Sequence, residues 1–229
     1  MSPPNKRPMC AACLRPQSTC ICRWAAPVSA VAEVLILQHP MEVANAKNSA
    51  RLLHLCLPGS RLESGECFDP ARLDALLAGP RRSLLLYPDT PGDASMGTAP
   101  APPFDPAWAG DPSALRLVVL DATWRKSRKM LYLNPALQRL PRLPLRSMPA
   151  SHYLIRKAHA PDQLSTLEAT AYALAQLEDD EKKFAPLITA FDGFVAQQQG
   201  QAHARRAALA ADLGSPGDTQ DQPWLGSPG

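Results

Sequence analysis

The sequence lacks any apolar run long enough to cross a membrane, because no stretch approaches the roughly 18 consecutive apolar residues that a membrane helix needs. Its first residues, MSPPNKRPM, also lack the apolar core of a secretory signal peptide. Both absences argue against a membrane-spanning or exported chain. We therefore expect a cytoplasmic protein with no membrane partner.

Acidic residues are nearly absent from one stretch of the chain. Between Asp121 and Ala160 there are nine Lys or Arg residues and one acidic residue, Asp121 itself, although the net charge of the 229 residues is only +3. Such a local cluster is expected of a surface that faces a polyanion, whereas a solvated face usually carries both signs. The stretch therefore favours nucleic acid as a partner.

Four of the six cysteines lie in one short segment, CAACLRPQSTCIC, with the spacing C-x2-C-x6-C-x-C. These are Cys10, Cys13, Cys20 and Cys22. Four thiolates this close can surround a tetrahedral zinc ion at about 2.3 Å per ligand. Four unrelated reduced thiols are the plain alternative, and an iron–sulfur cluster is the chemical competitor. The two remaining cysteines, Cys56 and Cys67, are expected to be small buried apolar residues.

Short apolar runs alternate with helical patterns through the middle of the chain. Buried strands are predicted in residues 31–38, 83–88 and 115–121. Helices are predicted in residues 46–59, 69–80, 164–178 and 181–199, and a short helix followed by a short strand in residues 134–145. This alternation predicts an α/β fold with a mostly parallel sheet covered by helices.

Three parts are expected along the chain: a cysteine-rich zinc-binding segment in residues 1–28, a catalytic domain in residues 29–212 and a disordered tail in residues 213–229. The tail contains two copies of GSPG and has little to bury. Residues 88–112, rich in Pro, Gly and Asp, are expected to form a long loop.

Several polar residues fall where ligands bind in open α/β sheets, beyond the carboxyl ends of strands. Tyr87, Pro88 and Asp121 all stand at such ends. Four cations then occupy the first turns of the next helix, where the helix dipole disfavours them unless an anion is present: Arg125, Lys126, Arg128 and Lys129. A phosphate backbone would remove that conflict.

Ser165 and Glu168 follow the capping-box pattern, which explains both residues without any function. A capped helix start also presents backbone N–H groups that can hold a carboxylate or a phosphate.

These segments together resemble one known family. Asp121-Ala122-Thr123-Trp124 matches the D-x-T-W signature of the DTW-domain family of tRNA-uridine aminocarboxypropyltransferases. The segments HPMEVANAKNSARLL, LLLYP and LSTLEA are similar to further motifs of that family, in the same order, and the cysteine cluster is similar to that of its bacterial members. Ser49 stands where Thr is common and Ala122 where Gly is common, and neither departure alters the resemblance.

The resemblance implies a SPOUT-like fold with a trefoil-knotted site for S-adenosylmethionine. It also implies transfer of the 3-amino-3-carboxypropyl group from that co-substrate to uridine N3 in tRNA. Spacing alone does not suggest a knot, since threaded chains are very rare. Two alternatives stay open: a noncatalytic zinc-dependent RNA-binding module on the same scaffold, and a SPOUT-type RNA methyltransferase.

The motifs also imply roles for single residues. Asp121 is the candidate catalytic residue, either as general base at N3–H or as an anchor for the nucleobase. An ordinary Asp, with a pKa of about 3.9, is a weak base near neutrality, so the base role requires burial or a raised pKa. Candidate residues for S-adenosylmethionine are Tyr87, Pro88, Thr123, Leu164, Ser165, Thr166 and Glu168. Candidate residues for tRNA or ligand contact are His39, Arg51, Trp124, Arg125, Lys126, Arg128, Lys129 and Arg156.

Some of these roles carry a structural expectation. His39 and Arg51 are expected to be exposed, and Trp124 is expected to be a core residue that follows a strand rather than a stacking platform. Glu168 is expected to meet the ammonium of the transferred group only if the helix cap leaves it available.

Overall fold

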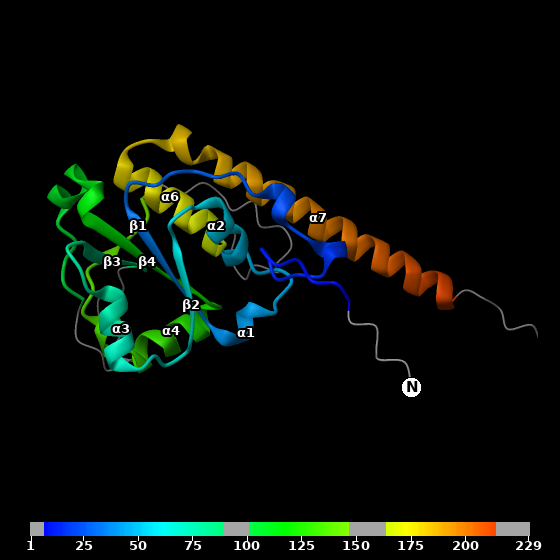
Figure 1. Ribbon diagram of the computed structural model, residues 1–229, viewed down its shortest axis with the longest axis horizontal. Coiled ribbons are helices and arrows are strands. Elements are labelled where there is room, and N and C mark those ends of the chain that lie inside the picture. The colour runs from blue at the N-terminus through cyan, green and yellow to red at the C-terminus, as the bar shows by residue number, and fades with distance from the viewer. Residues whose placement is uncertain (1–6, 89–100, 147–163, 214–229) are drawn as a thin grey trace, which may run out of the picture.

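Figure 1 shows the computed structural model, which describes residues 7–88, 101–146 and 164–213. The strands are β1 (Glu33–Gln38), β2 (Arg61–Ser64), β3 (Arg82–Leu86), β4 (Leu115–Asp121) and β5 (Arg142–Leu143). The α-helices are α1 (Pro40–Val43), α2 (Ala50–Cys56), α3 (Pro70–Leu77), α4 (Trp124–Leu133), α5 (Pro135–Gln138), α6 (Thr166–Glu178) and α7 (Glu181–Leu213). Short 3-10 turns are η1 (Gln17–Thr19), η2 (Cys22–Trp24), η4 (Pro106–Gly110) and η5 (Pro112–Ala114).

The five strands form one sheet in the order β2-β1-β4-β3-β5, and every described pair is parallel. The predicted α/β fold with a parallel sheet is therefore confirmed. After β1 the chain continues to β2 at one edge of the sheet, and after β4 it continues to β5 at the opposite edge. This reversal makes the carboxyl ends of β1 and β4 the switch point at which open α/β sheets bind ligands.

Alternating side chains of the strands build a separate core on each face of the sheet. Val34 and Ile36 face the core that α2, α6 and α7 cover, whereas Leu35 and Leu37 face the core of α3, α4 and α5. Figure 1 shows this separation, with α2, α6 and α7 on one side of the strands and α3 and α4 on the other. Because both faces are buried, the central strands are continuous apolar runs in the sequence.

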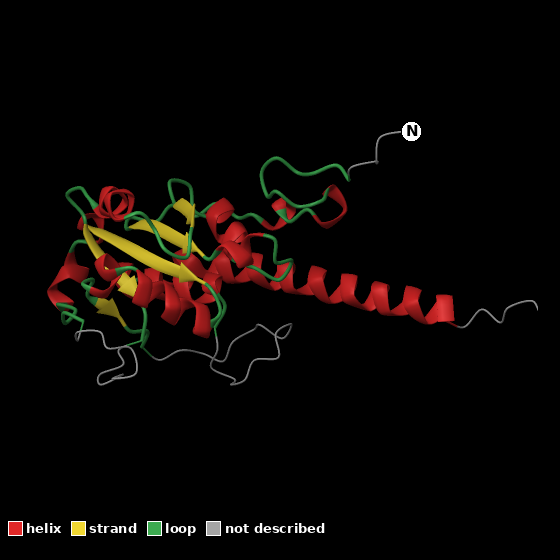
Figure 2. Cartoon of the chain, turned by 90° about the horizontal axis from the view of Figure 1, so that it is seen from below, coloured by secondary structure: helices red, strands yellow, loops and turns green. Residues whose placement is uncertain are grey.

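Helix starts follow local chemistry that the sequence predicts. The Asp69 side chain accepts a hydrogen bond from the N–H of Arg72 and caps α3, with Pro70 in the first position. Ser165 and Glu168 form the predicted capping box at α6. Helix α7 continues to Leu213, well past the predicted end, and Figure 2 shows its last turns extending beyond the sheet.

The cysteine-rich segment packs against the main body rather than standing apart. Cys13, Ile21 and Val28 are buried in the same core as β1 and α7. Trp24 lies against the backbone of α7 at Gly193, where a Cβ atom would collide with the indole ring. A glycine in mid-helix lets the two elements approach this closely.

Some expectations fall outside the described residues. They concern most of the loop 88–112, whose described end forms η4 and η5, and the tail beyond Leu213. Residues 147–163, which form most of the chain between β5 and α6, also lie there, so the trefoil knot implied by the resemblance stays a prediction. Among the described helices, none has the length and apolar character that a membrane crossing requires.

Candidate active site

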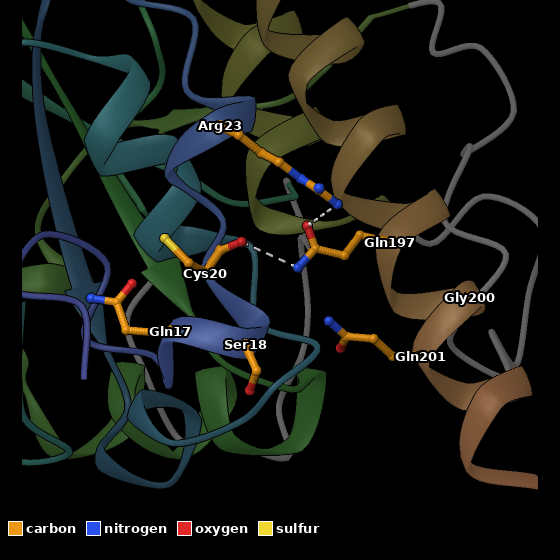
Figure 3. Close-up of a pocket in the computed structure, with 7 residues that line it drawn as sticks. All are labelled: Gln17, Ser18, Cys20, Arg23, Gln197, Gly200 and Gln201. Carbon is orange, nitrogen blue, oxygen red and sulfur yellow. Dashed lines mark hydrogen bonds between the residues drawn. The ribbon is translucent and has the colours of Figure 1, made fainter. Parts of the chain in front are cut away.

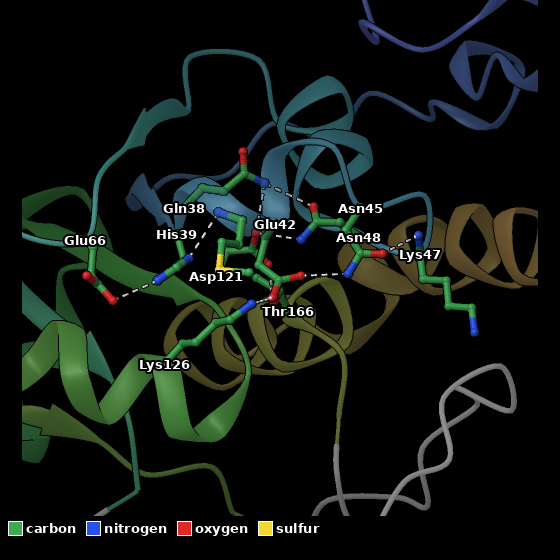
Figure 4. A network of polar contacts seen from close by, with 11 residues as sticks. Gln38, His39, Glu42, Asn45, Lys47, Asn48, Glu66, Asp121, Lys126 and Thr166 are labelled. Atoms are coloured by element: carbon green, nitrogen blue, oxygen red, sulfur yellow. Dashed lines mark hydrogen bonds and ion pairs between the residues drawn. The ribbon is translucent and has the colours of Figure 1, made fainter.

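The switch point carries a polar network on an otherwise apolar sheet. Gln38 ends β1 and Asp121 ends β4, and the parallel register places these two residues directly opposite each other. Figure 4 shows the side chains that surround them, which come from β1, the segment before α2, β4 and the start of α6. Parallel pairing thus gathers residues that are far apart in the sequence.

Asp121 is at the centre of this network and is only 2% exposed. Its Oδ2 accepts hydrogen bonds from Gln38 Nε2 at 2.8 Å and Asn48 Nδ2 at 2.6 Å, and its Oδ1 accepts one from Thr166 Oγ1 at 2.7 Å. Burial raises the pKa of Asp121, and these three hydrogen bonds, which favour the ionised form, offset only part of that effect. The base role requires burial or a raised pKa, and Asp121 has both.

A second buried carboxylate lies close to the first. Glu42 of α1 is 1% exposed, and its charge also raises the pKa of Asp121. Lys126 Nζ donates to Glu42 Oε1 at 2.9 Å, and Asn45 Nδ2 donates to Glu42 Oε2 at 2.8 Å. The lysine and the amide therefore stabilise a negative charge that water barely reaches.

His39 is buried, so the expectation that it is exposed was wrong: only 5% of it is accessible. It begins α1, and its Nδ1 accepts a hydrogen bond from the N–H of Met41. In the neutral ring this leaves the proton on Nε2, which lies 3.0 Å from Glu66 Oε1. Glu66 also pairs with Lys129 at 3.0 Å, so His39 is held in place by the capped helix on one side and by a carboxylate on the other.

The start of α6 joins the network through backbone and side chains. Glu168 is fully buried, and its Oε2 accepts a hydrogen bond from the N–H of Ser165 at 2.8 Å. Since the cap engages Glu168, the condition for its contact with an ammonium group is not met in this structure. The N–H groups of Leu167 and Glu168 donate to Ser49 Oγ and Ser165 Oγ, which leaves the first turn less able to hold an anion than the sequence suggested.

Trp124 is not a core residue, contrary to the expectation, because 47% of it is exposed. One face of its ring stacks on Tyr87, with ring centroids 5.1 Å apart and planes 16° apart. Tyr87 itself is buried, and the adjacent Pro88 is exposed at the end of β3. The two aromatic residues follow neighbouring strands and meet beside the switch point.

The remaining predicted contact residues lie on several elements, including α2, α4 and the start of α6. Arg125 is exposed, Arg128 and Arg51 are half-buried, and Thr123 is the N-terminal cap residue of α4 without a side-chain capping bond. Leu164 is half-buried just before α6, and Arg156 lies outside the described residues. Two of the four predicted phosphate ligands, Lys126 and Lys129, therefore have protein carboxylates as partners.

The four clustered cysteines bring their sulfur atoms together. All four Sγ atoms lie within 4.8 Å of one another, with Cys10 to Cys22 at 3.6 Å and Cys13 to Cys20 at 3.7 Å. A tetrahedron with bonds of about 2.3 Å has edges of about 3.8 Å, so these separations suit ligands of a single ion. Backbone N–H groups lower the pKa of Cys10 to about 6, whereas burial and the neighbouring thiols raise that of Cys22 to about 12. A cation among the thiols would therefore favour the ionised form of Cys22 at neutral pH.

The other two cysteines differ from each other. Cys56 is buried as expected, but Cys67 is exposed, so the expectation for Cys67 was wrong.

A pocket of about 460 Å³ lies between the cysteine segment and α7 (Figure 3). Its lining residues are Gln17, Ser18, Cys20, Arg23, Gln197, Gly200 and Gln201. Gln197 joins the two walls: its Nε2 donates to Cys20 O at 3.2 Å, and its Oε1 accepts from Arg23 and from Trp24 Nε1. The pocket shares no lining residue with the Asp121 network, so it is a separate feature that ties the cysteine cluster to α7.

Sequence reasoning missed several residues of the polar network around Asp121 and His39 as site residues. The missed residues are Gln38, Glu42, Asn45, Asn48 and Glu66. Four of them lie in or beside the segment HPMEVANAKNSARLL, which carries part of the family resemblance, so the motif itself was the available signal. Glu66 belongs to no quoted motif, and only the fold brings it to His39.

The fold and the two sites define a class: a parallel α/β protein with a buried carboxylate at the sheet's switch point and a four-cysteine cluster able to hold a metal ion. Residues 7–199 match the DTW domain family, and the chain belongs to that family.

Relatives from animals match most of the chain. A Drosophila melanogaster protein named tRNA-uridine aminocarboxypropyltransferase 2 is 33% identical over 77% of this chain and 69% of its own length. The proteins of the same name from Macaca fascicularis and Mus musculus are 29% and 32% identical, and the matches cover 78% and 76% of this chain. These matches cover 59% and 58% of the two mammalian proteins, so the chain spans less than two thirds of their length. No solved structure gives a significant match.

Proposed function

We propose that this chain is a tRNA-uridine aminocarboxypropyltransferase that alkylates uridine N3 in tRNA with the 3-amino-3-carboxypropyl group of S-adenosylmethionine. The observation that carries the proposal is the buried carboxylate of Asp121, with its raised pKa, at the switch point of the sheet. Family membership and the names of the relatives support the same reaction.

In the proposed reaction, a bond forms between uridine N3 and the γ-carbon of the aminobutyrate group, and the bond from that carbon to sulfur breaks. Sulfur leaves as the neutral thioether methylthioadenosine, and the N3 proton must go to the enzyme. A carboxylate beside the sulfonium would stabilise the ground state more than the transition state. Asp121 is therefore assigned to the proton of N3 rather than to the sulfur.

Asp121 is too deeply buried for a nucleobase to contact it directly in this arrangement. Thr166 is half-buried, and its hydroxyl donates to Asp121 Oδ1 at 2.7 Å, the length of a charge-assisted hydrogen bond. We propose that the N3 proton passes to Thr166 Oγ1 while the hydroxyl proton passes to Asp121. In this role Gln38 and Asn48, which hold Oδ2, keep Oδ1 directed at the threonine.

For the cysteine cluster we propose zinc. The Sγ separations match a single tetrahedral ion, whereas an iron–sulfur cluster binds its thiolates to different iron atoms and so holds them farther apart. Reduced thiols at this cluster fit the cytoplasm, where disulfides are rare.

The remaining surface assignments concern tRNA. Arg125 and Arg128 are proposed to contact its phosphates, because Arg125 is exposed and Arg128 lies one turn further along the same helix, α4. Lys126 and Lys129 of this helix pair with Glu42 and Glu66. A protein that held tRNA without reacting would have no use for the proton acceptor at the switch point.

The test is to incubate the purified chain with S-adenosylmethionine and tRNA lacking the modification, then to analyse the nucleosides by mass spectrometry and the supernatant for methylthioadenosine. We expect uridine to gain the aminocarboxypropyl group as methylthioadenosine appears. A gain of one methyl group, with S-adenosylhomocysteine as coproduct, would instead identify a methyltransferase. Binding of tRNA with neither product would identify the noncatalytic RNA-binding module.

A further inference from the structure

Trp124 presents one face of a large aromatic ring at the edge of the candidate active site. It begins α4 three residues after Asp121, and 47% of it is exposed. Its other face lies on Tyr87, which is only 5% exposed, with the planes 16° apart. Tyr87 thus covers one face of the ring, while nearly half of the residue stays exposed.

The support beneath this ring is buried. The guanidinium of Arg142, from β5, lies 5.1 Å from the centroid of the Tyr87 ring. Arg142 is itself buried and donates to the carbonyl of Pro88 at 3.3 Å. Three planar groups from β5, the end of β3 and the start of α4 thus form a stack of which only the outermost member reaches solvent.

An exposed tryptophan with a packed support has the properties of a stacking platform. A flat aromatic face that needs no rearrangement loses little conformational entropy when a planar group binds to it. Any of the nucleobases can stack on an aromatic side chain, and each such contact stabilises the complex measurably. The exposed cation Arg125 follows Trp124 directly and places positive charge beside the ring.

We infer that the outer face of Trp124 binds a nucleobase by stacking, with Tyr87 and Arg142 as the buried support. The inference rests on the proposed function, because both of its substrates carry nucleobases: the adenine of S-adenosylmethionine and the bases of a tRNA loop. The chemistry of the contact is the same for either source, and binding measurements distinguish them.

The experiment compares Trp124→Leu and Trp124→Phe with the parent protein. Leu keeps an apolar cover over Tyr87 but removes the flat ring, whereas Phe keeps a smaller ring. Trp108→Leu is the matched control, since Trp108 is a half-buried tryptophan of η4 that packs edge-on against Phe104. Dissociation constants are measured for S-adenosylhomocysteine, which carries adenine and does not react, and for unmodified tRNA.

We expect Trp124→Leu to weaken one of the two ligands about tenfold and Trp124→Phe to weaken it less than about threefold, while Trp108→Leu binds both as the parent does. Loss confined to S-adenosylhomocysteine assigns the platform to adenine, and loss confined to tRNA assigns it to an RNA base. A folded Trp124→Leu protein that binds both ligands with parent affinity would overturn the inference.

A second readout covers the case in which the leucine variant does not fold. Stacking quenches indole fluorescence, so ligand-dependent quenching should occur in the parent and in Trp108→Leu but not in Trp124→Phe. Equal quenching in Trp124→Phe and the parent would also overturn the inference. Both readouts are equilibrium binding measurements, so a parent protein that binds these ligands without transferring the group would contradict the proposed function and not the platform.

Discussion

At the scale of single residues, the hydrogen bonds of Asp121 decide which variant tests its chemistry. In Asp121→Asn, the amide oxygen can take the place of Oδ2 and accept from Gln38 and Asn48, and the amide NH2 can donate to Thr166 Oγ1. The network can therefore persist without the negative charge. We expect a folded protein that binds tRNA and transfers the group at least about a hundredfold more slowly, measured as single-turnover formation of the modified uridine.

Turnover of Asp121→Asn near the parent rate would mean that Asp121 serves only to hold its neighbours. Gln38→Ala is the useful companion, since it removes one hydrogen bond to Oδ2 and leaves the carboxylate in place.

The raised pKa of Asp121 also predicts how stability depends on pH. A carboxyl group whose pKa is higher in the folded state than in the unfolded state stabilises the fold at low pH, and that contribution is lost as pH rises through the folded value. Asp121→Asn removes this pH-dependent loss. We therefore expect the variant to gain stability relative to the parent as pH rises above the ordinary aspartate pKa, measured by thermal unfolding at pH 4 and pH 8.

A parent protein that gained stability over the variant in the same pH interval would contradict the sign of the pKa shift.

Two substitutions separate the role of the Thr166 hydroxyl from that of its methyl group. Thr166→Val removes the proton carrier and one hydrogen bond that favours ionised Asp121, so the pKa of Asp121 should rise further. We expect the rate to fall at least about tenfold and its pH profile to move to higher pH. Thr166→Ser keeps the hydroxyl and should stay within a few-fold of the parent; equal losses in both variants would assign Thr166 a packing role.

At the scale of elements, the cations of α4 separate into two kinds. Arg125 is exposed, whereas Lys126 pairs with the buried Glu42. Arg125→Gln should weaken tRNA binding and reduce the slope of log affinity against log salt by about one, without changing thermal stability. Lys126→Gln should instead destabilise the fold by on the order of 2 kcal/mol, because it removes the cation that pairs with the buried carboxylate of Glu42 and leaves that charge to neutral hydrogen-bond donors such as Asn45.

The two effects are measured by filter binding at several salt concentrations and by denaturant unfolding. An unchanged salt slope in Arg125→Gln would mean that Arg125 is a solvated charge that contacts no phosphate.

The sequence predicts elements well where one local pattern decides them. The central strands β1, β3 and β4 are continuous apolar runs, and the starts of α3 and α6 carry their own capping residues. The sequence did not predict β2, because this edge strand is short, polar and exposed at both ends. Its pairing with β1 comes from the parallel register rather than from its own composition.

At the scale of the whole molecule, the candidate site depends on strand order, which a single sequence does not contain. Asp121 was predicted because it ends an apolar run, but its partners Asn48 and Thr166 stand 73 and 45 residues away along the chain. The burial of His39 and the exposure of Trp124 were not predicted for the same reason, because both depend on residues that the fold brings together. Glu66 and the α1 cap enclose the histidine, and Tyr87 packs against one face of an indole that stays exposed.

The cysteine cluster is tested at the scale of the whole molecule, because Cys13 and Ile21 of its segment are buried in the main core. We expect about one equivalent of zinc per chain by elemental analysis and a loss of most of it in Cys20→Ser. Cys67→Ser, which changes an exposed cysteine outside the cluster, should keep its zinc. Full zinc retention in Cys20→Ser would contradict the four-ligand site.

With the proposed zinc bound at the cysteine cluster, the contact between the cysteine segment and α7 would link the metal concentration to the stability of the whole fold. A ligand that binds only the folded state stabilises it by about 2.7 kcal/mol when its free concentration is a hundred times its dissociation constant. Because Gln197 and Gly193 join the cluster to the helix that closes the main core, that free energy extends to the catalytic half. A strong chelator should then lower the melting temperature by about 5 to 10 °C, so that the amount of active enzyme in a cell follows its free zinc concentration.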